Sequence, residues 1–338
     1  MAGSESPQRA VTRNDVARLA GVSSAVVSYV VNNGPRPVAD ATRARVLDAI
    51  DKLGYRPNAA ARTLITGRSD LIGLVVPDIR NPYFAALAQA AETAARAHGV
   101  NLVLAQGATG ALEQLFESLA GHQAAGIITA SLPEPAALAV VARGRVPLVR
   151  LSLATPSEGT AIWPDYRGGA RSAVRHLVEV HGHRRVALVI GSDHPERGDE
   201  PPDGREQGWR DALEDAGLTT EHLVRVHWSA AGGADAARLL ATRHPAATAV
   251  FTSSDQQAIG LVSGLQGTGR SIPDDLALAS FDGSPEAAYT VPALTTVNVP
   301  LAAMAEDAVA ELLAPTGRSH RHETRLVTRR SCGCTPAA

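Results

Sequence analysis

The sequence has no long apolar run and very little cysteine. No hydrophobic stretch is long enough to span a bilayer, and the N-terminus shows no charged segment followed by an apolar one, the pattern that directs export. The two cysteines of the 338 residues, Cys332 and Cys334, form a C-x-C pair without the second ligand pair that a tetrahedral zinc site needs. We therefore expect a cytoplasmic protein with free thiols, no metal and no membrane association.

Motifs of several enzyme classes are also missing. The chain has no G-x-x-x-x-G-K-[ST] phosphate loop and no strand-linked G-x-G-x-x-G, and residues 267–269 are better explained as a loop. No nucleophile elbow and no pair of catalytic carboxylates stands out. His181, His183 and His194 match no metal-ligand spacing with carboxylates, so we interpret them as residues of a surface loop. The sequence predicts neither an enzyme nor a cofactor.

Charge is distributed unevenly along the chain. Residues 9–68 contain ten basic and four acidic residues, a formal charge of +6, which leaves −8 for the rest because the whole chain carries −2. A basic N-terminal segment suits a polyanion such as nucleic acid, because each neutralised phosphate releases counterions and adds affinity. A basic face can also simply be solvated, so a structural motif has to support this interpretation.

Residues 11–53 predict three short helices. Thr12 and Asp15 have the spacing of a capping box, Gly21 ends the first helix, Ser23 caps the second, and the third runs from about residue 40 to residue 53. The apolar residues expected to face the core are Val16, Leu19, Ala20, Val26, Val27, Val30, Val31, Val46, Ile50 and Leu53. Two helices joined by a tight glycine turn and closed by a third have the layout of a helix-turn-helix. The alternative is an ordinary three-helix mini-domain.

The second helix is the one that a helix-turn-helix places in the major groove. Its outward positions are Ser24, Ala25, Ser28 and Tyr29, whose short or amphipathic side chains can reach base edges. The valines of the same helix face the other way, so the pattern indicates a DNA-reading surface.

From residue 71 onward, apolar runs alternate with amphipathic helical stretches. Strands are expected at residues 71–76, 101–104, 126–129, 146–151, 185–190, 223–226, 249–252 and 276–281, and helices at residues 83–98, 166–181, 206–216, 234–242 and 255–265. Repeated β-α alternation with nearly uninterrupted apolar strands predicts an α/β fold with parallel sheets covered on both faces.

These units could build one barrel or two doubly wound lobes, and two lobes are favoured. A break in composition at residues 163–169 falls midway, and a second irregular stretch follows Tyr289. Two crossings between the lobes would create a hinged cleft, and ligands of open α/β sheets bind at the carboxyl ends of the strands.

Several motifs follow one another in order over nearly the whole chain. They lie at residues 11–23, 30–32, 53–64, 81–84, 205–209, 254–256, 280–282 and 294–297. Together they closely resemble the lactose-repressor (LacI/GalR) family of bacterial transcriptional regulators. The resemblance implies an N-terminal all-α helix-turn-helix domain joined by a hinge helix to a two-lobed effector domain like that of periplasmic sugar-binding proteins.

The resemblance also implies domain boundaries and partners. A flexible tail is expected at residues 1–10, the helix-turn-helix at 11–57, the hinge at 58–68, and the effector-binding and dimerisation domain at 69–338. The expected partners are palindromic double-stranded operator DNA, a small effector and a second copy of the chain. A mono- or oligosaccharide is the first choice of effector, and a purine or another polar metabolite is the alternative. Residues 331–338 are too few for a coiled coil that could assemble a tetramer. We therefore expect the chain to form a homodimer.

The DNA-binding residues implied by the resemblance lie in the helix-turn-helix and the hinge. They are Thr12, Ser23, Ser24, Ala25, Ser28, Tyr29, Asn32, Tyr55, Asn58, Arg62 and Leu64. Leu64 matches the leucine that wedges into the minor groove at the operator centre. Val26 and Tyr29 replace the usual threonine and arginine of the family, which predicts a different operator sequence.

The effector-binding residues implied by the resemblance are Asn81, Tyr83, Phe84, Asp165, Arg205, Trp228, Ser254, Asp255 and Asp282. Arg205 and Asp282 match a charged pair that can hold sugar hydroxyls, and Trp228 and Phe84 are candidates to stack on the ring. Arg197 is an alternative to Arg205, because residues 193–203 resemble an insertion and leave two ways to match this region to the family pattern. A pure periplasmic binding protein and an α/β enzyme are the competing interpretations, and the sequence leaves open whether the effector releases or promotes DNA binding.

Overall fold

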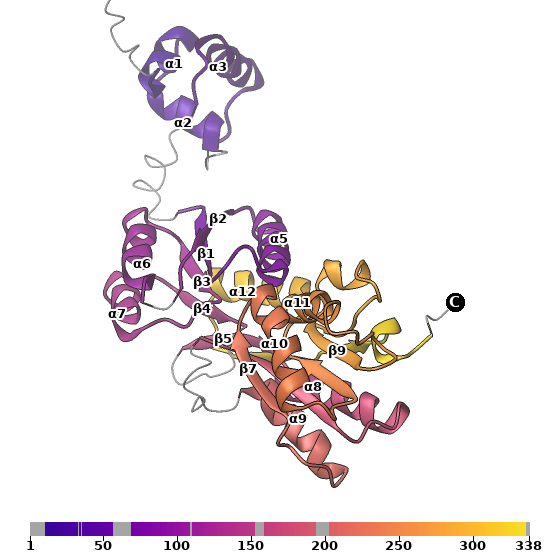
Figure 1. Cartoon of the computed structure of the whole chain (residues 1–338). Coiled ribbons are helices and arrows are strands. Elements are labelled where there is room, and N and C mark those ends of the chain that lie inside the picture. The colour runs from indigo at the N-terminus through magenta and orange to yellow at the C-terminus, as the bar shows by residue number, and fades with distance from the viewer. Residues whose placement is uncertain are drawn as a thin grey trace, which may run out of the picture. The chain divides into compact units, whose positions relative to one another are not determined.

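The computed structural model describes residues 11–32, 34, 36–56, 69–108, 110–152, 159–193 and 203–335. Contacts divide the chain into two compact units, Met1–Ser69 and Asp70–Ala338 (Figure 1). No helix within the described ranges combines the length and the apolarity that a membrane span requires.

Within its described residues, the first unit contains three helices, as the sequence predicted for residues 11–53. They are α1 (Arg13–Ala20), α2 (Ser24–Asn32) and α3 (Asp40–Leu53). The Asp15 carboxylate accepts hydrogen bonds from the Thr12 backbone N–H at 2.9 Å and from the Thr12 hydroxyl at 2.6 Å, which fixes the start of α1. Gly21 and Gly54 end α1 and α3 in the left-handed region, where glycine is not strained.

The small core of the first unit differs from the prediction at two positions. Val16, Val27, Val46 and Ala49 are buried in it, but Leu19 is exposed, and the inward position of α1 is Ala17. Val26 is half-buried and lies outside the core cluster. On α1, the set Val16, Leu19 and Ala20 and the set Val16, Ala17 and Ala20 both fit a 3.6-residue period. Packing against α2 and α3 therefore decides whether Leu19 or Ala17 is buried.

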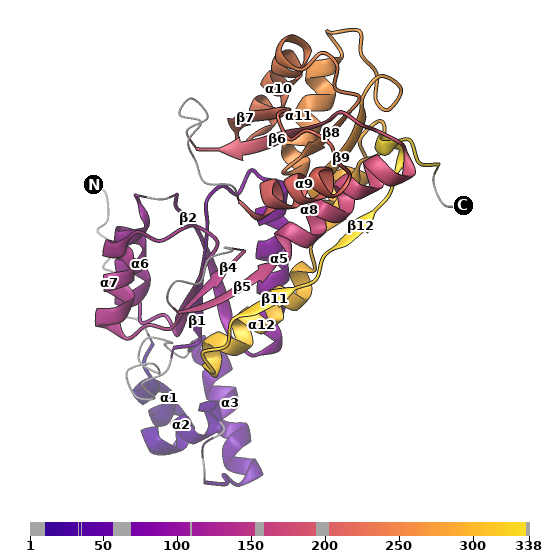
Figure 2. The ribbon, with the colours of Figure 1, turned by 90° about the horizontal axis from the view of Figure 1, so that it is seen from below.

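The second unit contains two six-stranded sheets, which confirms the two-lobed prediction over the barrel (Figure 2). The strand order is β11-β5-β4-β3-β1-β2 in the first sheet and β12-β10-β9-β8-β6-β7 in the second. Among the described strands, β10 and β12 pair antiparallel and the other neighbours pair parallel. The first sheet comprises β1 (Leu71–Val76), β2 (Asn101–Gln106), β3 (Gly126–Thr129), β4 (Leu148–Leu151), β5 (Thr160–Pro164) and β11 (His320–His322). The second comprises β6 (Val186–Ser192), β7 (Leu223–His227), β8 (Ala249–Thr252), β9 (Ala277–Asp282), β10 (Thr295–Asn298) and β12 (Arg325–Val327).

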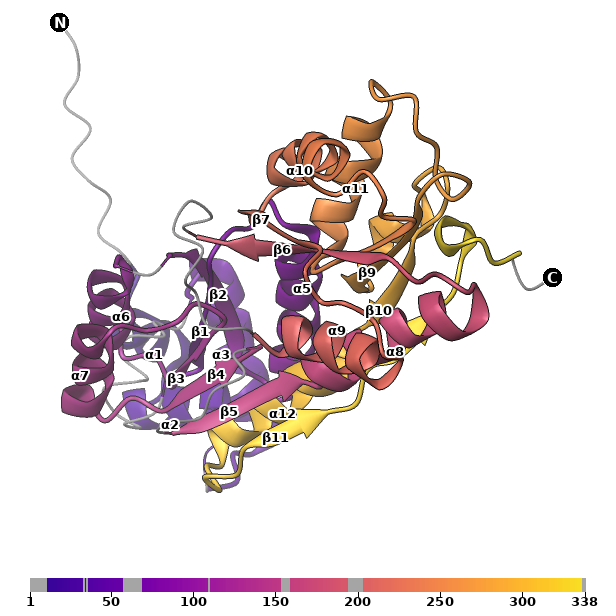
Figure 3. The ribbon, with the colours of Figure 1, turned by 60° about the horizontal axis from the view of Figure 1, so that its bottom comes forward.

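Helices cover both faces of each sheet. In the first lobe, α5 (Pro82–Ala97) packs with α12 (Leu301–Leu313), and α6 (Leu112–Gly121) packs with α7 (Pro135–Gly144). In the second lobe, the pairs are α8 (Tyr166–Arg175) with α9 (Gly204–Asp215) and α10 (Ala230–Arg243) with α11 (Asp255–Leu265) (Figure 3). Strand β1 sends Leu74 and Val76 into one core cluster and Val75 into another, because side chains of a strand alternate between its faces.

The chain crosses between the lobes three times, and not twice as expected. The crossings lie at Asp165, at Val299–Pro300 and at residues 323–324, the last between β11 and β12 (Figure 2). Strands β11 and β12 have three residues each, too few to show an alternating pattern, so sequence analysis missed the third crossing. It also missed β5 and β10, which contain threonine, proline and asparagine among their apolar residues.

Candidate functional site

An arginine of the second lobe lies among three aromatic rings. The Cζ of Arg205, in the first turn of α9, is 4.1 Å from the ring centroid of Tyr166, 5.1 Å from that of Phe281 and 5.5 Å from that of Trp228. The Arg205 side chain is 14% exposed. Cations are attracted to aromatic faces at these distances, so the rings stabilise a guanidinium that has lost most of its water.

Asp203 positions this arginine. Its carboxylate accepts the backbone N–H groups of Arg205 at 2.8 Å and Glu206 at 3.0 Å, which caps α9. The other carboxylate oxygen accepts the Nη1 of Arg205 at 2.9 Å. The Nε of Arg205 is buried and has no hydrogen-bond partner within the part of the chain that the structure describes. Asp203 therefore fixes the arginine in place, while its buried Nε remains without a partner among the described residues.

Asp282 supplies the opposite charge at the end of β9. It is 5% exposed and has a φ of 116°, a backbone conformation that costs a residue other than glycine about 1–3 kcal/mol. Burial raises the pKa of the Asp282 carboxyl well above its ordinary value, the charge of Arg205 lowers it in part, and Asp255 raises it further. Burial alone would lower the pKa of Arg205, but Tyr166, Asp203 and Asp282 favour its cation and raise the net pKa.

Trp228 reaches this group because a glycine makes room for it. A Cβ atom on Gly191, in β6, would lie 2.0 Å from the Trp228 ring. Only glycine leaves enough space for the indole at this position. The sequence predicted Trp228, Arg205 and Asp282 as a group, and the structure brings them together.

Tyrosines join this group to the first lobe. The Tyr166 hydroxyl donates to the backbone C=O of Ser152 at 2.7 Å, and the Ser152 Oγ lies 2.5 Å from the Tyr83 hydroxyl. Burial raises the pKa of Tyr166 to about 12 although Arg205 opposes the shift, so the hydroxyl remains a donor at neutral pH. Phe84 packs edge-on against Tyr83, with ring centroids 5.2 Å apart.

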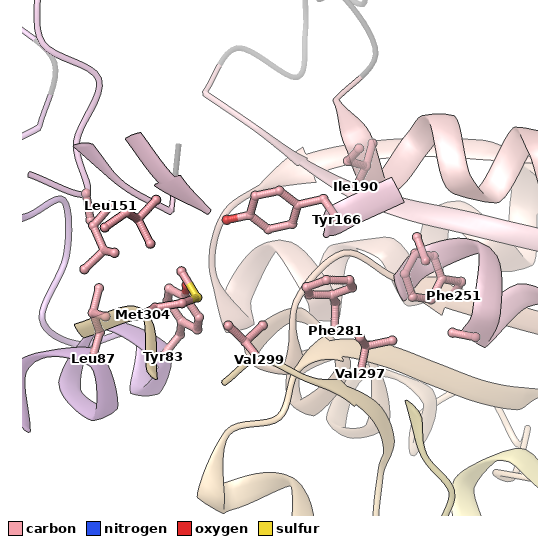
Figure 4. Close-up of a cluster of buried hydrophobic side chains, with 14 of the residues drawn as sticks. Tyr83, Leu87, Leu151, Tyr166, Ile190, Phe251, Phe281, Val297, Val299 and Met304 are labelled. Carbon is pink, nitrogen blue, oxygen red and sulfur yellow. The ribbon is translucent and has the colours of Figure 1, made fainter. Parts of the chain in front are cut away.

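One hydrophobic cluster continues from lobe to lobe around these tyrosines. Leu87, Leu151 and Met304 of the first lobe and Phe251 and Phe281 of the second belong to it (Figure 4). The polar groups of the site therefore lie beside an apolar contact between the lobes. Ser152, Trp228 and Asp282 all lie at or just after the carboxyl ends of parallel strands, where ligands of α/β sheets bind.

Four other predicted effector residues are engaged within the fold. Asn81 accepts the N–H of Tyr83 at 3.0 Å and caps α5, and Asp165 accepts the N–H of Gly168 at 3.1 Å and caps α8. Ser254 accepts the N–H of Gln257 at 3.3 Å and caps α11. The buried Asp255 accepts from the hydroxyl groups of Ser280 and Thr296 and from the N–H of Ser284. These four side chains therefore have structural hydrogen bonds within the fold, and their contact with a ligand stays a prediction.

Sequence analysis did not single out Tyr166, Asp203 and Phe281. An aspartate two residues before Arg205 at a helix start is a capping signal that could have pointed to Asp203. Nothing in the local sequence distinguishes Tyr166 or Phe281 from ordinary core aromatics. Arg197 lies outside the described residues.

The first unit presents the predicted DNA-reading positions on α2. Ala25 is exposed, whereas Ser24, Ser28 and Tyr29 are partly buried. Ser23 accepts the N–H of Val26 at 3.4 Å, at the start of the helix. The side chain of Asn32 and the residues Asn58, Arg62 and Leu64 lie outside the described part.

Tyr29 and Tyr55 have structural contacts as well. The Tyr29 C=O accepts the N–H of Gly34 at 3.0 Å, and a Cβ on Gly34 would lie 2.6 Å from the Tyr29 ring, so the ring covers this turn. Tyr55 is partly buried against the core. Among the basic residues, Arg13, Arg36 and Arg45 are exposed and available to phosphates.

Comparison with known proteins decides the family. A model described as bacterial regulatory proteins, lacI family, matches residues 12–58, and one described as a periplasmic binding protein-like domain matches residues 174–332. The transcriptional regulator CelR of Thermobifida fusca is 35% identical over 343 residues, covering 96% of this chain and 99% of CelR. GalR of Escherichia coli is 35% identical over 309 residues, covering 90% of this chain and 88% of GalR.

This chain belongs to the LacI family of bacterial regulatory proteins. A crystal structure of the Lac repressor dimer bound to operator and an anti-inducer aligns with a TM-score of 0.84 and 25% identity over 96% of this chain and 99% of that one. A CelR–cellobiose complex aligns with a TM-score of 0.69 and 32% identity over 95% of this chain and 99% of that one. The LacI-family fold, a helix-turn-helix followed by two α/β lobes, is the predicted one. The protein is a DNA-binding transcriptional regulator, and its relatives are regulators and not enzymes.

Asp282→Asn tests the electrostatics of the site. Burial raises the pKa of Asp282 in the folded state, so the protonated carboxyl stabilises the fold. This contribution to the free energy of unfolding is complete below the unfolded-state pKa of about 3.9, and it is lost as pH rises through the folded-state pKa. An asparagine does not titrate. We expect the free energy of unfolding of the variant, relative to wild type, to increase as pH is raised from about 5 to about 8 in denaturant titrations.

The exposed carboxylate of Asp235, on α10, provides the matched control. Asp235→Asn should follow the wild-type pH dependence more closely than Asp282→Asn does. A constant or decreasing stability difference between Asp282→Asn and wild type over this pH range would contradict the assignment.

Proposed function

We propose that this LacI-family regulator is a homodimeric repressor whose affinity for a palindromic operator is controlled by a sugar bound beside Arg205. The observation that carries the proposal is the buried Arg205 Nε without a partner among the described residues, next to Asp282 and three aromatic rings. An unmet buried donor costs about 1–3 kcal/mol, which a ligand oxygen at this position would recover.

The chemistry of the group favours a neutral polyol. A guanidinium N–H donates a hydrogen bond to a hydroxyl oxygen, and a carboxylate accepts one from a hydroxyl group. An indole face packs on the C–H face of a sugar ring. Asp203 and Asp282 disfavour an anionic ligand through charge repulsion. The complex of the relative CelR contains cellobiose, which supports a mono- or oligosaccharide.

The DNA-binding half of the proposal rests on α2 and its surroundings. Ser24, Ala25, Ser28 and Tyr29 are the proposed base-reading positions, and exposed arginines of the same unit contact phosphates. Residues 58–68 form the proposed hinge between the helix-turn-helix at 11–57 and the effector domain at 69–338. Leu64 is the proposed minor-groove wedge. The Lac repressor, to which this chain is similar, is bound to operator in its crystal structure, which supports binding to operator DNA.

The proposed dimer provides two reading helices for a two-fold operator. The edge strand β2 leaves Val103 41% and Leu104 40% exposed, which suits a surface that a second copy covers. The Lac repressor relative is a dimer on its operator. The protein acts by binding and not by catalysis, in the cytoplasm where the chromosome lies.

Ala25→Glu tests the DNA-reading surface. An operator is first selected from a random duplex library with the intact chain, and we expect a palindrome whose binding weakens linearly with the logarithm of salt concentration. A glutamate at the exposed position 25 faces phosphates and bases, so operator affinity should fall at least about tenfold. The same change at the exposed Ala136 of α7 should leave affinity unchanged. Undiminished operator binding after deletion of residues 1–67 would overturn the proposal.

Arg205→Lys tests the effector site. A thermal-unfolding screen of the intact chain with mono- and disaccharides should find at least one that raises the unfolding midpoint, because a ligand of the folded state stabilises it. Lysine keeps the charge but lacks the planar set of donors, so affinity for that sugar should fall at least about tenfold. Arg171→Lys, an exposed arginine paired with Asp215, is the control and should respond like wild type. A wild-type response in Arg205→Lys would refute the site.

A further inference from the structure

Two histidines and two cysteines from distant segments meet at one end of the second lobe. They are His176, His181, Cys332 and Cys334, and their ligand atoms all lie within 4.8 Å of one another. Neither the DNA-reading surface nor the Arg205 group uses them. The cluster therefore calls for a separate explanation.

The distances within the cluster have the scale of a metal coordination sphere. The two Nε2 atoms are 3.1 Å apart, the His176 Nε2 lies 3.4 Å from each sulfur, and the His181 Nε2 lies 3.4 Å from the Cys334 Sγ. A tetrahedral zinc ion with Zn–N of about 2.05 Å and Zn–S of about 2.3 Å places its nitrogens about 3.3 Å apart and each nitrogen about 3.6 Å from a sulfur. The observed spacings differ from these by only a few tenths of an ångström.

A π-helical turn brings the two histidines to one side. In an α-helix, residues five apart point in different directions, because one turn takes 3.6 residues. Here α8 continues into the π-turn η1 (His176–Val180), whose wider turn aligns His176 with His181. Their rings meet edge to face with centroids 4.9 Å apart. Such π-turns are rare and are frequently found at functional sites.

The C-terminal segment is held so that both thiols face these nitrogens. The Ser331 hydroxyl donates to the C=O of Leu278 at 2.7 Å, and the Ser331 N–H donates to the C=O of Ala293 at 3.0 Å. Gly333, with a φ of 98°, reverses the backbone between the cysteines at little conformational cost. Cys332 is 1% exposed, and the Thr295 hydroxyl donates to its sulfur at 3.0 Å, the kind of outer contact that orients a metal ligand.

We propose that His176, His181, Cys332 and Cys334 bind one structural Zn²⁺ ion. Two thiolates and two neutral imidazoles balance the charge of the ion, and a tetrahedral S₂N₂ donor set is typical of zinc. Sequence analysis missed the site because the second ligand pair comes from about 150 residues upstream. It also placed His181 in a surface loop, whereas His181 directly follows the π-turn at the end of the α8 helix.

The ion would fasten the last segment of the chain to this helix. That segment follows the third crossing between the lobes and includes β12 and the short turn η3 (Arg330–Cys332). The helix begins at Tyr166, whose ring covers Arg205, and ends at the cluster. Zinc would thus stabilise the part of the second lobe where η1 ends, at the opposite end of the helix from Tyr166. This role is independent of the proposed function.

A second cluster in the first lobe provides an internal control. The Asp307 Oδ2 lies 3.0 Å from the His320 Nδ1 and 3.0 Å from the His322 Nε2. This group contains no thiolate, so the spectrum of bound Co²⁺ distinguishes it from the cysteine cluster. His320→Ala removes one of its ligands at an exposed position.

Co²⁺ and Zn²⁺ titration of the intact, tag-free chain tests the proposal. The protein is treated with a chelator, kept reduced, and titrated with Co²⁺ and then with Zn²⁺. We expect one equivalent of Co²⁺ to give a thiolate-to-metal charge-transfer band, which Zn²⁺ abolishes by displacement. Zn²⁺ should also raise the thermal-unfolding midpoint, because it binds the folded chain.

Variants separate the metal site from a folding defect. Cys334→Ser changes a partly exposed ligand, and its metal-free unfolding midpoint should match that of the metal-free wild type. It should bind Co²⁺ at least about tenfold more weakly, as should His181→Gln, whereas His320→Ala should keep the wild-type band. The proposal is overturned if the reduced wild type shows no thiolate–cobalt band. It is equally overturned if Cys334→Ser and His181→Gln both bind Co²⁺ like wild type.

Discussion

The burial of one positive charge organises the effector half of this protein. The guanidinium of Arg205 has lost most of its water, and Asp203, Asp282 and three aromatic rings replace that hydration. The partners come from four parts of the second lobe: Asp203 from the start of α9, Tyr166 from α8, Trp228 from the end of β7, and Phe281 and Asp282 from β9. A charge in this setting is stable only while all of them are in place, so the fold of the lobe and the chemistry of the site depend on each other.

The same group connects the lobes. Tyr166 contacts Arg205 with its ring and the backbone of Ser152 with its hydroxyl, and Ser152 in turn contacts Tyr83 of the first lobe. A ligand that engages Arg205 and Asp282 would change the forces on this chain of contacts. Because the proposed hinge, residues 58–68, directly precedes β1 of the first lobe in the sequence, a shift of one lobe against the other is a physical route from sugar to operator.

Local patterns predicted those parts of the structure that local interactions determine. The eight apolar strands, the helix-turn-helix and the charged pair of Arg205 and Asp282 were predicted from alternation, capping residues and motif resemblance. The burial of Ala17 in place of Leu19, the three-residue strands β11 and β12, and the aromatic partner Tyr166 depend on tertiary packing that no local pattern records. The same limit explains the zinc proposal, whose histidines and cysteines are brought together only by the path of the chain and a π-turn.

The central claim is that sugar binding and operator binding are coupled. Titrating the protein with one of these ligands in the presence of the other measures the coupling directly. The dissociation constant of the intact chain for its selected operator is determined at increasing concentrations of the stabilising sugar. The account predicts a change of at least about tenfold, and an equal change in sugar affinity when operator is saturating, because coupling between two binding sites is reciprocal. An operator affinity that stays constant while the sugar saturates the protein would contradict it.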